Sequence, residues 1–142
     1  MKIPIKLNFE TYSSSIGVDE AILNTWTQLT YQQCGIESAE VDVNVVNRHD
    51  GEYYNSVFRK KQGPTNVLSF PDGVSGGEII MCDPVIIDEA KIHELSITAR
   101  YFQVYVHGLL HLIGYTHDHD ADTREMEAIE DKLFDQFDIN RT

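Results

Sequence analysis

The sequence predicts one α+β domain, residues 1–142, in which a four-stranded sheet packs against helices. Three observations support this fold class. Short stretches alternate apolar and polar residues, as strands do, and longer stretches repeat apolar residues every three or four positions, as helices do. No internal repeat, low-complexity tract or linker interrupts them. A chain of 142 residues, 42% of them apolar, can bury one core and is too short for two ordinary domains.

Alternation is the main evidence for the strands, and it is clearest in VDVNVV, residues 41–46. Turn residues bound the later strands. Gly63-Pro64 precede one of them, and Pro71-Asp72-Gly73 separate it from the next. The predicted strands are residues 2–9, 41–46, 66–70 and 76–82.

Apolar periodicity and terminal residues define the helices. Gly35 follows the apolar stripe of the first helix and is expected to stop it. Asp50 is expected to cap a short second helix. Asp83 and Pro84 are typical of a helix start. The predicted helices are residues 18–33, residues 52–60, a segment from Asp83, residues 95–113 and residues 123–137.

The net charge is strongly negative, because 11 Lys and Arg stand against 23 Asp and Glu, a formal charge of −12. Such a charge repels polyanions at long range and by itself disfavours nucleic acid as a partner. Arg59, Lys60 and Lys61 form the only basic triplet in the sequence. This local cluster could still hold phosphate groups in an otherwise acidic protein.

Two further features concern the cellular compartment. Cys34 and Cys82 lie far apart in the sequence, and we expect reduced thiols. No apolar run approaches the roughly 18 residues of a membrane span, and the first ten residues alternate like a strand instead of resembling an export signal. The prediction is a cytoplasmic protein with no membrane partner.

Four of the six histidines lie between residues 106 and 120. His107 and His111 are four positions apart on a predicted helix, which places them about 40° apart around its axis and one turn apart along it. Gly114 is expected to end this helix and reverse the chain, so that His117 returns to the same point. Three imidazoles with a fourth position open to water are typical of a catalytic zinc site. The sequence therefore predicts one Zn²⁺ per chain, bound by His107, His111 and His117.

The sequence also allows other roles for these histidines. His107 and His111 could be core residues satisfied by hydrogen bonds. Two unpartnered imidazoles in a buried apolar helix would, however, each cost about 1–3 kcal/mol or more in desolvation. His119, in the acidic loop that follows, could replace His117 as the third ligand.

Gly108 separates this motif from that of the metallopeptidases with similar spacing. The pattern H-x3-H-x2-G-x2-H is that of the metzincins, except that Gly108 occupies the position of their catalytic glutamate. A peptidase without that general base would be crippled. The motif thus predicts the metal and disfavours peptide hydrolysis. The missing side chain is expected to leave room beside His107 for another backbone segment or a bulky substrate.

Several segments together resemble the YbeY family of bacterial rRNA maturation factors. They are HGLLHLIGYTH, with FRKKQGPTNVLSFP upstream, GEIIMC between them and EMEAIEDKLF after them. The resemblance covers roughly residues 41–137. It implies a mixed sheet related to that of the zincins, with His107, His111 and His117 as zinc ligands and Arg59 as the functional arginine.

Two positions depart from the usual pattern of this family. Thr116 stands where an aspartate usually precedes the third histidine, and Glu78 replaces the aspartate of a G-D-I segment. Neither change removes a predicted metal ligand. Thr116 does change a residue that could orient His117 or a bound water.

The resemblance also implies a function, namely a metal-dependent endoribonuclease specific for single-stranded RNA. Its implied substrate is an rRNA precursor, processed at the 3′ end of 16S rRNA and in ribosome quality control, with ribosomal-subunit or assembly proteins as partners. His107 would act in catalysis as a metal ligand, and Arg59 would donate to the phosphate in the transition state. Two alternatives are a zincin-like metallohydrolase of a non-RNA substrate and a non-catalytic ribosome-assembly adaptor that contains zinc.

Overall fold

The computed structural model describes residues 4–59, 66–115 and 120–136. It confirms the predicted α+β class with one four-stranded sheet. In chain order the elements are β1 (Ile5–Thr11), α1 (Glu20–Gln33), β2 (Ala39–Val46), α2 (Arg48–Tyr54), the π-helix η1 (Asn55–Arg59), β3 (Val67–Pro71), β4 (Gly77–Cys82), α3 (Asp83–Ile92), α4 (Ile97–Ile113) and α5 (Asp120–Gln136).

The sheet is mixed, with the strand order β1-β2-β4-β3. β1, β2 and β4 are parallel, and β3 runs antiparallel to β4 at the edge. Ile79 on β4 lies opposite Val43 of β2 and Ser69 of β3. The edge strand β3 is therefore joined to the centre of the sheet through β4 alone.

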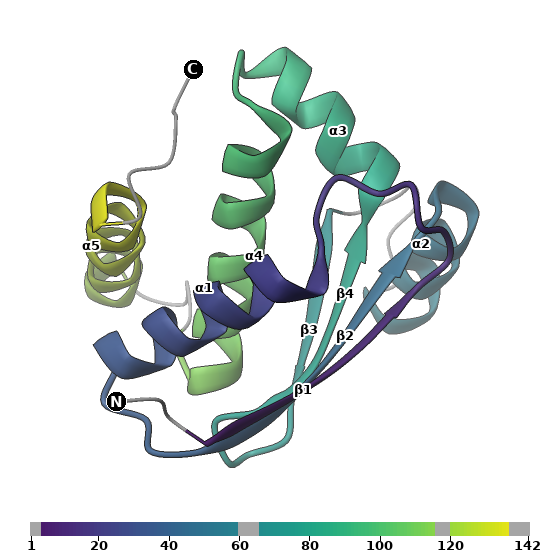
Figure 1. The fold of residues 1–142 in the computed structure, drawn as a ribbon. Helices are drawn as coiled ribbons and strands as arrows, with labels where there is room; N and C mark the ends of the chain where they lie inside the picture. Colours follow the sequence, from purple (N-terminus) through teal and green to yellow (C-terminus); the bar gives the residue numbers. More distant parts are fainter. Residues whose placement is uncertain (1–3, 60–65, 116–119, 137–142) are drawn as a thin grey trace.

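The helices cover the two faces of the sheet unequally. Figure 1 shows α1, α4 and α5 on one side and α2 on the other. The main core lies on the first side, where Val43 and Ile79 from the sheet meet Trp26 of α1 and Leu109 of α4. Within the described ranges, no helix combines the length and apolar character that crossing a bilayer requires.

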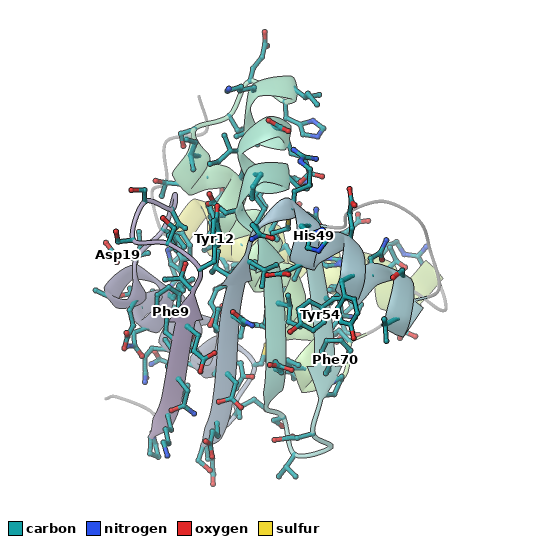
Figure 2. The ribbon with its side chains drawn as sticks, turned by 90° about the vertical axis from the view of Figure 1, so that its right-hand side faces the viewer. Phe9, Tyr12, Asp19, His49, Tyr54 and Phe70 are labelled. Atoms are coloured by element: carbon teal, nitrogen blue, oxygen red, sulfur yellow. The ribbon has the colours of Figure 1, made fainter. Side chains whose placement is uncertain are left out.

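A smaller apolar cluster lies on the other side of the sheet. Successive strand residues point to opposite faces, so Ile80 faces away from the side that Ile79 occupies. Tyr54 of α2 and Phe70 of β3 cover this cluster, and they lie close together in Figure 2. Its buried members are Val46, Leu68, Ile80 and Cys82.

α2 and α4 are among the helices that begin at other residues than predicted, and each is capped by a side chain that the sequence analysis did not single out. Asn47, instead of Asp50, caps α2, and its side chain accepts a hydrogen bond of 2.8 Å from the backbone N–H of Asp50. The helix consequently starts four residues earlier and then widens into η1. Ser96 caps α4 through a hydrogen bond of 3.1 Å from the Ala99 N–H, so this helix starts at Ile97.

Buried polar contacts tie α4 to its neighbours. Asp83, at the start of α3, accepts hydrogen bonds from the Tyr101 hydroxyl and from the Gly17 N–H, the latter at 3.0 Å. The hydroxyls of Thr27 and Tyr105 are 2.7 Å apart, so α1 is hydrogen-bonded to α4. Buried hydrogen bonds have little freedom to rearrange. They hold α4 in place and, with it, the side chains further along the helix.

Carboxylates crowd the sheet face opposite α4. Glu78 on β4 pairs with Asp42 on β2. Partial burial, together with the charges of Asp42 and Glu10, raises the pKa of Glu78 above its usual 4.5. The folded state then binds this proton more tightly than the unfolded state. The stability that Glu78 contributes is thus greatest below its unfolded pKa and is lost as the pH rises through the folded pKa.

Glu78→Gln is expected to stabilise the fold at pH 7 by about 0.2–1 kcal/mol, because it removes one of two like charges on paired strands. The gain should disappear toward pH 4, where Glu78 of the parent becomes protonated. Thermal unfolding at both pH values measures the effect. Glu37→Gln, which removes the same charge from an exposed loop residue, is the control. A loss of stability in Glu78→Gln at pH 7 would contradict this explanation.

Candidate metal centre and cleft

His107 and His111 lie on successive turns of α4. Their Nε2 atoms are 3.1 Å apart, and their ring centroids are 4.6 Å apart with the planes at 77°. The same ring nitrogen of each imidazole therefore approaches one place. The structure brings these two side chains together, as their spacing predicts.

A cleft of about 650 Å³ lies between β3, α4 and α5, and both histidines line it. The side chain of His107 is 30% exposed, whereas Tyr105 and Leu109 of the same helix are fully buried. The expectation that the whole helix is buried was therefore wrong for this face. The imidazoles lie at a solvent-accessible surface, so the desolvation argument against two core histidines does not apply at full strength.

Glu130 of α5 contacts the back of one imidazole. Its Oε2 lies 3.4 Å from Nδ1 of His107. A proton on Nδ1 would be attracted to this carboxylate, which leaves the lone pair of Nε2 directed toward His111. The contact thus favours the tautomer of His107 that can bind a metal through Nε2.

The sequence analysis did not single out Glu130 among the carboxylates of the last predicted helix, residues 123–137. A signal was nevertheless present. Met126 and Leu133 form part of the buried stripe of α5, and Glu130 lies four residues after the first and three before the second. A carboxylate inside an apolar stripe faces inward. Its partner could be identified only once α5 was placed against α4.

The two described imidazoles fit a shared zinc ion. Two nitrogens at 2.0–2.1 Å from a tetrahedral zinc lie about 3.3 Å apart, close to the 3.1 Å between the two Nε2 atoms. The carboxylate behind His107 supplies the outer contact that zinc-binding histidines usually have. Among the described residues no third ligand joins the pair.

The predicted third zinc ligand, His117, and the side chain of Arg59 lie outside the described part of the structure. Gly114 ends α4 with a φ of +124°, in the left-handed region as expected for a helix terminator. Residues 116–119, which include His117 and its alternative His119, lie outside the described structure. Arg59 ends η1, but its side chain is also outside the described structure. Zinc binding by His117 and phosphate binding by Arg59 therefore stay predictions.

The missing side chain at Gly108 makes room for the sheet. A Cβ atom there would lie 3.2 Å from Ser69 Oγ, 3.3 Å from Val67 Cγ2 and 3.4 Å from Ile79 Cδ1. The Ser69 hydroxyl also donates a 3.2 Å hydrogen bond to the Gly108 carbonyl. The expectation of room for a bulky substrate was wrong, since side chains of β3 and β4 occupy this space, whereas the alternative expectation of room for another chain segment agrees with the position of β3. The glycine lets α4 approach β3 closely.

Gly108→Ala is expected to change stability by less than about 1 kcal/mol, because better helix propensity offsets the tight Cβ contacts. Gly108→Glu should cost on the order of 2–4 kcal/mol, because a charged side chain would be forced against Val67 and Ile79. Urea unfolding of both variants measures the difference. A Gly108→Glu variant as stable as Gly108→Ala would show that this position faces open space.

Comparisons with known proteins agree with the observed fold and with the family that the sequence resembles. The family model described as Endoribonuclease YbeY matches residues 8–138. A protein named Endoribonuclease YbeY from Pseudomonas syringae pv. syringae is 33% identical over 140 residues, which are 93% of this chain and 84% of that protein. One of the same name from Stutzerimonas stutzeri is 34% identical over 137 residues, which are 91% and 85% of the two chains.

A solved structure supports the fold independently. The solution structure of TM1509 from Thermotoga maritima aligns with a TM-score of 0.64 and 24% identity, covering 92% of this chain and 87% of that one. At this identity the likeness concerns the fold alone. The family is shown by the sequence matches, which span nearly the whole chain. On that basis the chain belongs to the Endoribonuclease YbeY family.

Proposed function

We propose that this protein is a zinc-dependent endoribonuclease that cleaves single-stranded RNA during rRNA processing. The observation that carries the proposal is the approach of two Nε2 atoms to 3.1 Å within a cleft, with a carboxylate behind one of them. Membership of an endoribonuclease family supports RNA as the substrate. The 3′ end of 16S rRNA and ribosome quality control are the proposed settings, with ribosomal or assembly proteins as partners.

His107 and His111 would hold the zinc together with His117, which the sequence places four residues after the end of α4. When bound, zinc supplies a Lewis acid for a phosphoryl oxygen and lowers the pKa of a water toward 7. Three neutral imidazoles leave the positive charge of the ion uncompensated. This chemistry needs no glutamate at the position of Gly108.

The protein's own groups would orient and stabilise the reacting phosphate. The Glu130 carboxylate, 3.4 Å from Nδ1 of His107, would hold a proton there and so direct Nε2 toward the metal. Arg59 would donate two N–H groups to the phosphoryl oxygens as negative charge grows on them. Gly108, packed against the sheet, provides no general base, which argues against peptide hydrolysis as the activity.

The negative charge of the protein is consistent with an enzyme that needs a basic protein partner to bind its RNA. At a net charge of −12 the chain repels RNA at long range. A basic ribosomal or assembly protein would compensate for this repulsion and bring the cleft to its RNA. We therefore expect weak binding of free RNA and efficient cleavage only at high RNA concentration or on assembled particles.

Cleavage of labelled RNA by the purified protein tests the proposal. We expect endonucleolytic products from a single-stranded RNA, little cleavage of the same sequence in a perfect duplex, loss of activity with a chelator and recovery on adding zinc. Unchanged cleavage after complete removal of metal would contradict the zinc dependence. Zinc binding without cleavage of any RNA would favour the adaptor function instead.

Replacing Glu130 tests the contact behind His107. Glu130→Ala is expected to lower zinc affinity about 10- to 100-fold, because the imidazole loses the group that orients it. Glu130→Gln, whose amide oxygen still accepts from Nδ1, should recover part of the loss. Competition with a chromophoric chelator measures the affinity. Glu127→Ala, which removes another cleft carboxylate of α5, is the matched control. Equal affinity in Glu130→Ala and the parent would rule out the contact.

A further inference from the structure

The cleft has a second polar region, two helical turns away from the histidine pair. Arg100 lies seven residues before His107 on α4, which is about 10 Å along the axis at 1.5 Å per residue. Seven residues complete nearly two turns, so both side chains leave the helix on the same side. Among the described residues, Arg100 is the sole lysine or arginine that lines the cleft.

The guanidinium of Arg100 is held by neighbouring side chains. Its Nε and Nη2 donate to Oε1 of Glu89 at 3.2 and 3.0 Å, and its Nη1 donates to Oε1 of Gln103 at 2.9 Å. Asn66 also donates to Oε1 of Glu89, at 3.1 Å. Glu89 thus divides its hydrogen bonding between two partners. An arginine oriented in this way loses less rotational freedom when it binds a ligand.

The guanidinium of Arg100 has N–H groups that its contacts with Glu89 and Gln103 do not use. A guanidinium carries five N–H groups, and the contacts with Glu89 and Gln103 use three of them. The side chain is 20% exposed, so it reaches the surface of the cleft. The two remaining groups match the oxygens of a phosphate.

Carboxylates of α5, on the wall of the cleft opposite Arg100, limit the path that a bound RNA strand can take. Glu127, Glu130 and Asp131 of α5 line that side of the cleft and repel phosphates. An RNA strand that reaches the histidines is therefore favoured along the wall formed by α4 and β3, which passes Arg100. A separation of about 10 Å exceeds the size of one phosphate and corresponds to about three stacked nucleotides, or fewer in an extended strand.

We infer that Arg100, oriented by Glu89 and Gln103, binds a backbone phosphate of the RNA about one to three nucleotides from the scissile bond. The inference rests on the proposed function and adds a second anchor to it. With one anchor at the scissile phosphate and another further along the cleft, the strand is held at two points. A flexible single strand can follow this path more easily than a stiff duplex.

Removing single phosphate charges from the substrate tests this site. A single-stranded RNA with one preferred cleavage site is prepared as a series, each member with one methylphosphonate at a different position. We expect Arg100→Gln to lower kcat/KM on unmodified RNA about 10- to 100-fold, mainly through KM, as for loss of a charge-assisted hydrogen bond. At one position near the scissile bond, a methylphosphonate should lower the kcat/KM of the parent by about the same factor as Arg100→Gln does. The same methylphosphonate should not lower the kcat/KM of Arg100→Gln any further.

Two other variants separate phosphate binding from the link between α3 and α4. Arg100→Lys keeps a cation and should recover part of the lost activity and the response to the same methylphosphonate. Arg48 does not line the cleft, and its guanidinium lies 2.6 Å from the carboxylate of Asp88. Arg48→Gln removes this arginine and should behave like the parent. The inference is overturned, while the proposed function stands, if Arg100→Gln and Arg100→Lys lose the same activity as each other and that loss does not depend on the position of the methylphosphonate. If the parent cleaves no single-stranded RNA, the proposed function fails and this inference fails with it.

Discussion

Alanine at either cleft histidine, in His107→Ala or His111→Ala, is expected to abolish stoichiometric zinc binding and to reduce RNA cleavage to background. Each change removes one of the two Nε2 atoms that are 3.1 Å apart. Loss of a direct ligand should lower zinc affinity by more than the roughly 10- to 100-fold typical of an outer contact. Metal analysis after dialysis, followed by the cleavage assay on the same samples, measures both effects.

Other histidines provide the comparison for this result. His49→Ala changes an exposed side chain on α2 and should retain about one zinc per chain. His117→Ala should behave like the two cleft variants, and His119→Ala like the parent. Unchanged metal content in His107→Ala or His111→Ala would refute the site. A greater loss in His119→Ala than in His117→Ala would transfer the third ligand to His119.

Arg59→Lys is expected to raise the barrier to RNA cleavage by on the order of 2–4 kcal/mol, a loss of roughly 30- to 1,000-fold in rate. Lysine keeps the positive charge but cannot donate the two parallel hydrogen bonds of a guanidinium. Arg59→Glu should cost at least as much. Steady-state cleavage kinetics measure the effect, with thermal midpoint and zinc content expected to stay close to those of the parent.

The neighbouring lysine supplies a matched control for Arg59. Lys60→Gln removes a charge from the same basic triplet and should weaken RNA binding more than it slows the chemical step. If cleavage by Arg59→Lys stays within a few-fold of the parent while remaining sensitive to chelator, Arg59 does not bind the reacting phosphate. Arg100, about 10 Å along α4 from His107, would then be the cleft cation to test for that role.

The parts of the site that depend on local spacing could be predicted from the sequence. His107 and His111 meet because four residues make about one helical turn, and Gly114 ends their helix in the left-handed region. The strand around Val43 followed from alternation in the same way. In each case, neighbours in the sequence determine the geometry.

The parts that depend on packing between distant segments could not be predicted. Glu130 reaches His107 only because α5 lies beside α4, and Gly108 proved to face β3 instead of the cleft. Arg100 became a candidate only when its position in the cleft was known. No periodicity relates the partners of these contacts. They follow from the way the helices cover one face of the sheet (Figure 1).

The central claim, that a single zinc ion in this cleft enables RNA cleavage, is tested most directly by titrating zinc into metal-free protein while following cleavage of a single-stranded RNA. Cleavage is expected to rise in proportion to added zinc and to level off at about one equivalent per chain. The metal-free His111→Ala variant should show no such rise. Full cleavage before any zinc is added, or an identical titration curve for His111→Ala, would contradict the claim.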